Sequence, residues 1–116
     1  MGIWLKSPGL LDHETVRWKK FANRTQGNRA VGGCLYLTER RLIFEPNRFD
    51  AVTKGRSWSA WLKSIESVGT EAPNGNGFSG GLRTRLRLDL DDGHSECFVV
   101  NGVQDVITEL DRAIQG

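Results

Sequence analysis

The sequence has no apolar run long enough to cross a bilayer. Its longest stretch without a charged residue, 72–82, is rich in glycine, whereas a transmembrane helix needs about 20 mostly apolar residues. Residues 1–6 lack the apolar core of a secretory signal, and Lys6 stands where a myristoylation signal requires Ser or Thr. We therefore expect a cytoplasmic protein without a transmembrane helix.

Cysteine is scarce, with only Cys34 and Cys97. Two cysteines cannot build a disulfide scaffold, and a cytoplasmic chain keeps its thiols reduced. With His13 and His94 they make four possible zinc ligands, but their spacing fits no zinc motif, and His94 and Cys97 fall on opposite faces of a strand. We expect two core thiols that do no chemistry, and no metal or other cofactor.

A large excess of one charge sign is also lacking, because the net charge is +2. That value is too small to indicate a nucleic-acid-binding protein. The charges are nevertheless distributed unevenly. Residues 1–58 carry 11 Lys and Arg against 5 Asp and Glu, a net of +6, whereas residues 59–116 carry 5 against 9, a net of −4. An anionic partner is therefore expected to meet the first half of the chain.

The 116 residues suffice for one domain, and its first half reads as strands. Residues 14–22 alternate apolar with basic side chains until Phe21, which shifts the phase as a bulge does. The other predicted elements are a loop at 23–28, a strand at 30–38, a turn at 38–41, a strand at 42–44 closed by Pro46, and a long polar hairpin loop at 47–56.

The second half contains one ambiguous segment and several clear ones. Residues 57–68 have apolar side chains at helical spacing, but their many serines also allow two short strands around a turn. The other predicted elements are a flexible loop at 70–81, a strand at 82–90, a tight turn at 91–93, a strand at 94–100 and an amphipathic helix over 103–114. The sequence thus predicts six or seven strands followed by one helix.

Features that would indicate an enzyme are weak. Residues 75–80 fit the pattern GxGxxG, but a strand follows them where a nucleotide-binding fingerprint requires a helix. Asp91 and Asp92 are adjacent carboxylates, and the hairpin turn explains both. We interpret residues 75–80 as a loop, and we expect no catalytic residues.

Two groups of basic residues are candidates for binding an anionic partner. The first lies in the predicted hairpin loops, where Phe49 either inserts into a membrane interface as an apolar anchor or packs under its own loop. The second is a row of arginines on one face of the strand at 82–90. This row is either a solvated face, where Ser95 or Glu96 on the paired strand compensates the charge, or a docking surface for an acidic partner. The loop group comprises Arg24, Arg29, Arg48, Phe49, Lys54 and Arg56, and the strand group comprises Arg83, Arg85 and Arg87.

One run of residues resembles a known family, the GRAM domain. The specific part is 33–46, a glycine followed by the letters CLYLTERRLIFEP, and weaker likeness includes Trp58 and the strand ending at Val100. The resemblance covers about residues 14–114. It implies a pleckstrin-homology-like (PH-like) fold, a partly open barrel of seven strands in two sheets, capped at one end by a C-terminal helix.

The resemblance also implies binding and not catalysis. GRAM domains bind membrane lipids or protein segments and contribute no catalytic residues. We therefore expect a GRAM-type domain at 14–116 after an N-terminal extension at 1–13, which recruits an anionic membrane lipid or an acidic protein segment, in the cytoplasm or at the inner membrane face. The alternative is a protein-interaction or oligomerisation unit that binds no lipid.

Overall fold

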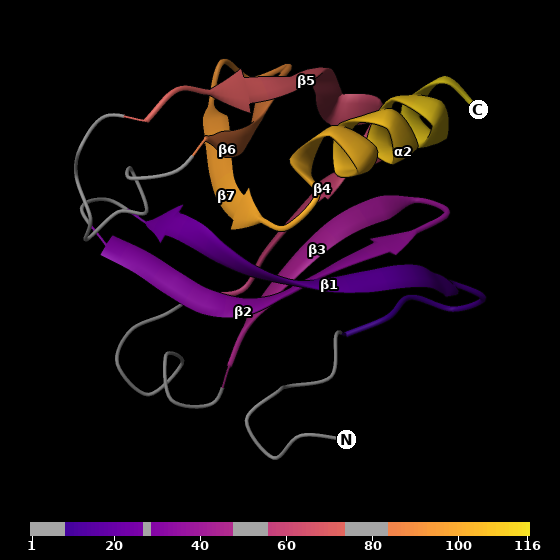
Figure 1. Cartoon of the computed structure of the whole chain (residues 1–116). Coiled ribbons are helices and arrows are strands. Elements are labelled where there is room, and N and C mark those ends of the chain that lie inside the picture. Colours follow the sequence, from indigo (N-terminus) through magenta and orange to yellow (C-terminus); the bar gives the residue numbers. More distant parts are fainter. Residues whose placement is uncertain (1–8, 27–28, 48–55, 74–83) are drawn as a thin grey trace.

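The computed structural model describes residues 9–26, 29–47, 56–73 and 84–116. These residues form seven strands, a short 3-10 turn and a C-terminal helix (Figure 1). The prediction of six or seven strands followed by one helix is confirmed. The elements are β1 (Val16–Gln26), β2 (Arg29–Thr38), β3 (Arg41–Pro46), β4 (Trp58–Trp61), the 3-10 turn (Leu62–Ser64), β5 (Ile65–Glu71), β6 (Arg85–Leu90), β7 (Ser95–Val100) and α2 (Val103–Gln115).

All seven strands belong to one antiparallel sheet with the order β4-β3-β2-β1-β7-β6-β5. Figure 1 shows the sheet folding over itself, so that β1 to β4 form one layer and β5 to β7 face it from the other side. Among the described strands, β4 and β5 are the two edges and do not pair with each other. The expected partly open barrel is therefore an open, strongly curled sheet.

Strand β1 joins the two layers. It pairs with β2 along its length, but with β7 only from Ala22 to Arg24. The predicted bulge at Phe21 is wrong, because the register shift lies between Val16 and Trp18. Beyond that shift the alternation continues unbroken, which leaves Phe21 on the outer face of the sheet with 75% of its surface exposed.

The predicted loop at 23–28 is also wrong in part. Residues 23–26 continue β1, because they pair residue by residue with the start of β2. Cross-strand pairing in the hairpin therefore overrides the polar, loop-like composition of this segment.

The GRAM-like run at 33–46 forms the β2–β3 hairpin. Leu35 and Phe44 are fully buried in the core. The Thr38 hydroxyl accepts hydrogen bonds from the backbone N–H groups of Arg40 and Arg41, which fixes the turn. Gly33 lies so close to β3 that an added Cβ would be 2.2 Å from the Glu45 carbonyl oxygen. The glycine of the run is thus required by the close approach of two strands.

The ambiguous segment at 57–68 forms two short strands around a turn. Strands β4 and β5 are joined by the 3-10 turn, so the helical reading is wrong. Leu62 and Ile65 are buried at this corner. Their apolar spacing reflects a change of strand direction at Leu62–Ser64 and not one face of a helix.

The last hairpin and the helix follow the predicted pattern. Leu86 and Leu88 of β6 are fully buried, and Gly93 occupies the tight turn with a φ of 91°, which favours glycine. Helix α2 packs on β5, β6 and the 3-10 turn, and it buries Val106 and Leu110 completely. It is too short and too polar to span a membrane, which is true of every helix in the described ranges.

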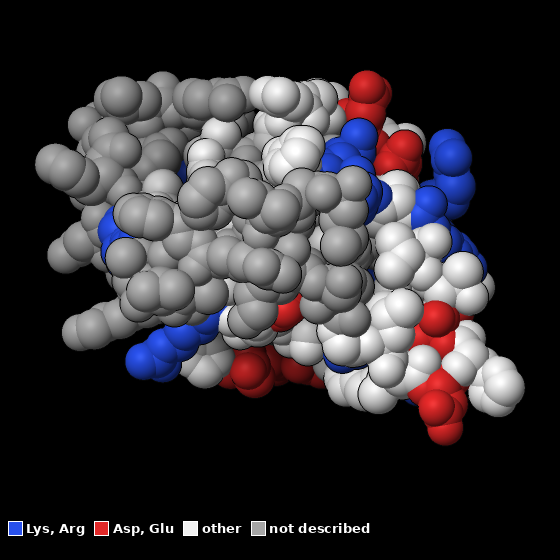
Figure 2. Space-filling view, turned by 90° about the horizontal axis from the view of Figure 1, so that it is seen from below, with Lys and Arg blue, Asp and Glu red and all other residues white. Residues whose placement is uncertain are grey.

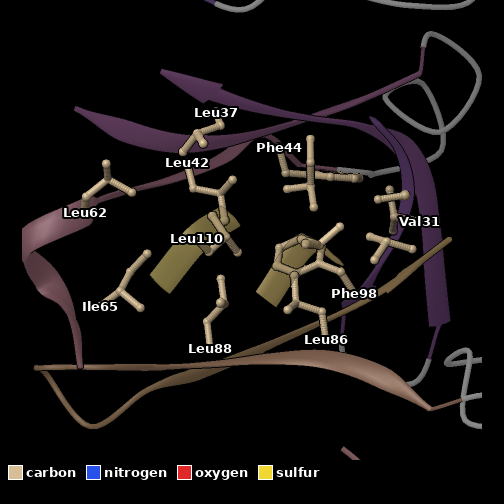
Figure 3. Packing of buried hydrophobic residues seen from close by; sticks show 14 residues of the cluster. Val31, Leu37, Leu42, Phe44, Leu62, Ile65, Leu86, Leu88, Phe98 and Leu110 are labelled. Atoms are coloured by element: carbon tan, nitrogen blue, oxygen red, sulfur yellow. The ribbon is translucent and has the colours of Figure 1, made fainter. Parts of the chain in front are cut away.

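The core lies between the two layers. Figure 3 shows Phe44 of β3 and Phe98 of β7 pointing toward each other, beside Leu110 of α2. The two phenyl rings are tilted, with their centres 5.7 Å apart. A second, smaller buried cluster of Cys34, Tyr36 and Ile43 lies on the opposite face of β2 and β3.

Candidate functional site

Arg24, the first predicted basic site residue, is neutralised within the protein. Its Nε lies 2.9 Å from Glu96 Oε1 and its Nη2 lies 3.3 Å from Glu96 Oε2. Its guanidinium carbon is also 5.9 Å from the centre of the Trp58 ring. Only 13% of the Arg24 side chain is exposed. Sequence reasoning missed this pair because the two residues are 72 positions apart.

Arg29 and Arg56 are brought to the same end of the β1–β2 hairpin. Arg29 opposes Gln26 in the ladder, and the Gln26 Oε1 accepts a hydrogen bond of 3.1 Å from the backbone N–H of Arg56. The backbone N–H of Asn47 donates to the Gly32 carbonyl at 2.9 Å. The chain on both sides of residues 48–55 is therefore attached to this hairpin. We call this end, with Arg29 and Arg56, the loop end.

Arg48, Phe49 and Lys54 lie outside the described residues, as does Arg83 of the strand group. The GxGxxG pattern at 75–80 also lies outside them. What the sequence indicates for these residues therefore stays a prediction. Figure 2 shows that, over the described part of the face seen from below, acidic and basic side chains are interspersed.

The arginines of β6 do not form an exposed basic row. Arg87 lies 2.7 Å from Glu71 Oε1 and 3.0 Å from Asp89 Oδ1, and it also donates to the Ser95 hydroxyl. The Glu71 and Asp89 hydrogen bonds raise the pKa of Arg87. Arg85 is only 4% exposed and donates to Thr25 Oγ1 at 3.1 Å. The charge of Arg87 is thus compensated by Glu71 and Asp89, and the side chain of Arg85 is buried.

Asp89 completes this network on the outer face of the second layer. It accepts hydrogen bonds from the hydroxyls of Ser95 at 2.6 Å and Ser67 at 2.9 Å. These two bonds, with Arg87, hold the pKa of Asp89 at about 2. Two residues were predicted to contact the arginine row. Ser95 accepts a hydrogen bond from Arg87, whereas Glu96 forms an ion pair with Arg24.

The two thiols lie on different strands and are not joined in a disulfide. Cys34 of β2 is buried in the outer cluster, and Cys97 of β7 is partly buried opposite Arg87 in the ladder. Burial raises the pKa of both thiols. Burial also raises the pKa of Tyr36, beside Cys34, to about 12. Within the described ranges, no group of three His, Cys, Asp or Glu side chains is arranged to hold a metal.

The opposite end of the molecule carries a surface that the sequence analysis missed. Trp61, the last residue of edge strand β4, is 48% exposed beside a pocket of about 440 Å³. Leu62 from the 3-10 turn and Ala113 and Ile114 from α2 line this pocket. We call Trp61, its pocket and the rim residues Arg40 and Lys63 the Trp61 surface. In the sequence, Trp61 is one of several apolar residues at helical spacing within 57–68, and this pattern does not indicate which of them is exposed.

The Trp61 ring contacts an arginine that is part of a buried ion pair. The Arg41 guanidinium carbon lies 5.9 Å from the centre of the Trp61 ring. Arg41 contacts Glu14 through Nη2–Oε1 at 2.6 Å and Nε–Oε2 at 2.9 Å, and the Glu14 side chain is fully buried. The Thr38 hydroxyl donates to the same carboxylate at 2.8 Å. The Arg41 contact is the main cause that lowers the pKa of Glu14 to about 2.

Comparison with known proteins identifies the fold. The sequence matches no protein-family model and no curated protein. Solved structures are similar in fold at low sequence identity. The C-terminal domain of an unknown protein from Leishmania infantum has a TM-score of 0.69 at 10% identity, over 89% of this chain and 86% of that one.

Two further structures have assigned names. The hSac2 domain from human phosphoinositide phosphatase Sac2 has a TM-score of 0.68 at 16% identity, over 91% of this chain and 73% of that one. The PH domain of USP37 has a TM-score of 0.51 at 16% identity, over 84% of this chain and 96% of that one. The chain therefore has a PH-like fold, as predicted. At these identities the likeness concerns the fold alone.

Proposed function

We propose that the chain is a GRAM-type binding module that performs no catalysis and is recruited through its loop end to an anionic membrane surface. The module spans residues 14–116 and acts in the cytoplasm at the inner membrane face, with residues 1–13 as an extension. The PH-like fold supports the coarser part of this proposal, a binding domain. The GRAM identity is supported by the run at 33–46, whose glycine, leucines and turn build the β2–β3 hairpin.

The single observation that carries the membrane proposal is that Arg29 and Arg56 lie at the same end of the β1–β2 hairpin. The hydrogen bond from the Arg56 backbone N–H to the Gln26 side chain brings Arg56 to the end of the hairpin that carries Arg29. Arg24 is excluded from the binding residues because Glu96 already neutralises it. The proposed membrane residues are Arg29 and Arg56 at the loop end together with Arg48, Lys54 and the apolar anchor Phe49, which are proposed from the sequence.

The expected affinity follows from the number of charges. Each basic residue close to an acidic leaflet contributes about 1 kcal/mol. Four such residues would give roughly 4 kcal/mol, which corresponds to a dissociation constant on the order of 1 mM. Binding of this kind is weak and sensitive to salt, and insertion of an aromatic side chain would strengthen it.

Vesicle co-sedimentation of charge-reversal variants tests the proposal. The double variant Arg29→Glu, Arg56→Glu is expected to lose binding to phosphatidylserine vesicles at low salt. The matched control Arg40→Glu, Lys63→Glu changes the net charge equally at the other end of the molecule and should keep most of the binding. Equal losses in the two variants would mean that only net charge matters, and an unchanged first variant would rule out the loop end.

The second candidate function is a protein-interaction unit that binds no lipid. The Trp61 surface favours this candidate, because an exposed tryptophan beside an apolar pocket is typical of protein contacts. If the wild-type protein does not bind anionic vesicles at low salt, protein interaction becomes the proposed function.

A further inference from the structure

The Trp61 surface is preorganised for a ligand. Trp61 is clamped by Arg41, which is itself fixed by the buried Glu14. This contact restricts the Trp61 ring, which lowers the entropic cost of ordering it on binding. Tryptophan side chains with large exposed apolar area are also frequent energetic centres of protein interfaces.

The rim of the pocket carries two side chains that can contact carboxylates. Arg40 and Lys63 line the pocket, both are exposed, and neither has an ion-pair partner in the described part of the chain. The Glu39 carboxylate also borders the pocket, but it accepts hydrogen bonds from the backbone N–H of Thr15. The rim also includes Gly116 at the C-terminal end of helix α2, where negative charge gathers, so the groups that can contact an anionic ligand are the two exposed side chains of Arg40 and Lys63.

The shape of the surface favours a protein segment over a bilayer. The apolar lining from Leu62, Ala113 and Ile114 lies in a pocket, and a flat membrane interface cannot fill it. A volume of about 440 Å³ accommodates a large side chain such as Phe or Leu. Trp61 also ends β4, which is an edge strand among the described strands, so an extended segment has backbone groups to pair with.

We propose that the Trp61 surface binds an acidic protein segment that places a bulky apolar side chain in the pocket, while flanking carboxylates contact Arg40 and Lys63. This site is separate from the loop end. Figure 1 shows the β4–β5 connection and the C-terminal end of α2 on the side of the molecule away from the tip of the β1–β2 hairpin. A membrane-bound module could therefore hold a protein partner at the same time.

The test is selection from a phage-displayed library of random heptapeptides, followed by fluorescence anisotropy with the selected peptides. We expect selected peptides to combine Asp or Glu with an aromatic or large aliphatic residue. Replacing that apolar residue by Ala should weaken binding at least tenfold, and so should Trp61→Ala or the double variant Arg40→Glu, Lys63→Glu.

Two matched controls separate this site from nonspecific effects. Phe21→Ala removes an aromatic side chain that is 75% exposed on another face, and Arg17→Glu with Lys19→Glu reverses two exposed charges there. Both controls should bind the peptides as the wild type does, and circular dichroism should show that every variant is folded.

Three results would overturn the proposal. They are selection of basic or purely polar peptides, selection of no consensus, and binding that is insensitive to Trp61→Ala. Loss of vesicle binding in Trp61→Ala without any peptide binding would instead assign this surface to the membrane. Failure of the loop-end proposal is recognised separately, because it appears as vesicle binding that Arg29→Glu, Arg56→Glu leaves unchanged.

Discussion

Arg41 and Glu14 form a two-contact ion pair that attaches the segment before β1 to the outer face of the sheet. The pair has distances of 2.6 and 2.9 Å, and Arg41 also donates to the Gly9 carbonyl at 2.8 Å. The same guanidinium lies against the ring of Trp61. One buried carboxylate therefore supports both a structural attachment and the exposed tryptophan.

Replacing Glu14 by Gln should destabilise the protein by about 3 kcal/mol, because it leaves the Arg41 charge poorly compensated. Urea denaturation monitored by tryptophan fluorescence measures this change. Glu39→Gln is the matched control, because Glu39 is less buried and, within the described ranges, its carboxylate accepts hydrogen bonds from one backbone N–H group. A loss no larger than that of the control would show that the ion pair contributes little.

The Glu14 carboxyl should also make stability depend on pH. Its pKa is lowered from 4.5 to about 2 in the folded state. Its contribution is therefore complete above about pH 4.5 and is lost as the pH falls toward 2. The free energy of unfolding, measured by urea titration across this range, should fall less steeply for Glu14→Gln than for the wild type. Parallel pH curves would contradict the assignment.

Gly33→Ala should destabilise the protein by roughly 3 kcal/mol or more, because the added methyl group meets backbone atoms that cannot move aside. The nearest are the Glu45 carbonyl oxygen at 2.2 Å and the Pro46 Cα at 2.8 Å. Gly69→Ala in β5 is the control, since no atom lies within 4 Å of its added Cβ. Thermal melts of the two variants should differ clearly, and similar melting temperatures would refute the close approach.

Leu110→Ala should cost about 2 to 5 kcal/mol, because this side chain is fully buried between α2 and the sheet. Gln104→Ala on the exposed side of the same helix should change stability by less than about 0.5 kcal/mol. Chemical denaturation distinguishes them. Equal stability of both variants would mean that α2 is not docked in solution.

The thiols of Cys34 and Cys97 should react with a disulfide reagent at pH 8 more slowly than free cysteine does. Burial raises the pKa of both groups, which lowers the fraction of reactive thiolate. Unfolding in urea should restore rapid reaction of both. Fast reaction of either thiol in the folded protein would indicate an activated cysteine.

The fold was largely predictable because its signals are local. The alternation of Leu86 and Leu88 with arginines, the glycine turn at Gly93 and the apolar stripe that contains Leu110 each act within a few residues. The GRAM-like run supplied the arrangement of these elements. Phe21 was misread because a strand can leave a large aromatic side chain on its outer face, and sequence alone does not say which face is covered.

The candidate sites were less predictable because charge pairing is long-range. Whether Arg24 is free depends on Glu96, and whether Arg87 is free depends on Glu71, which lies 16 residues away on a neighbouring strand. The Trp61 surface depends on the corner at Leu62 and on the end of α2. No pattern within one segment contains that juxtaposition.

The most direct test of the proposed function is co-sedimentation of the wild-type protein with phosphatidylserine vesicles at about 50 mM and about 300 mM salt, with phosphatidylcholine vesicles as the neutral control. We predict binding to the anionic vesicles at the lower concentration, its loss at the higher one, and no binding to the neutral vesicles. Absence of binding to the anionic vesicles at low salt, or binding that salt does not weaken, would contradict recruitment through basic residues of the loop end.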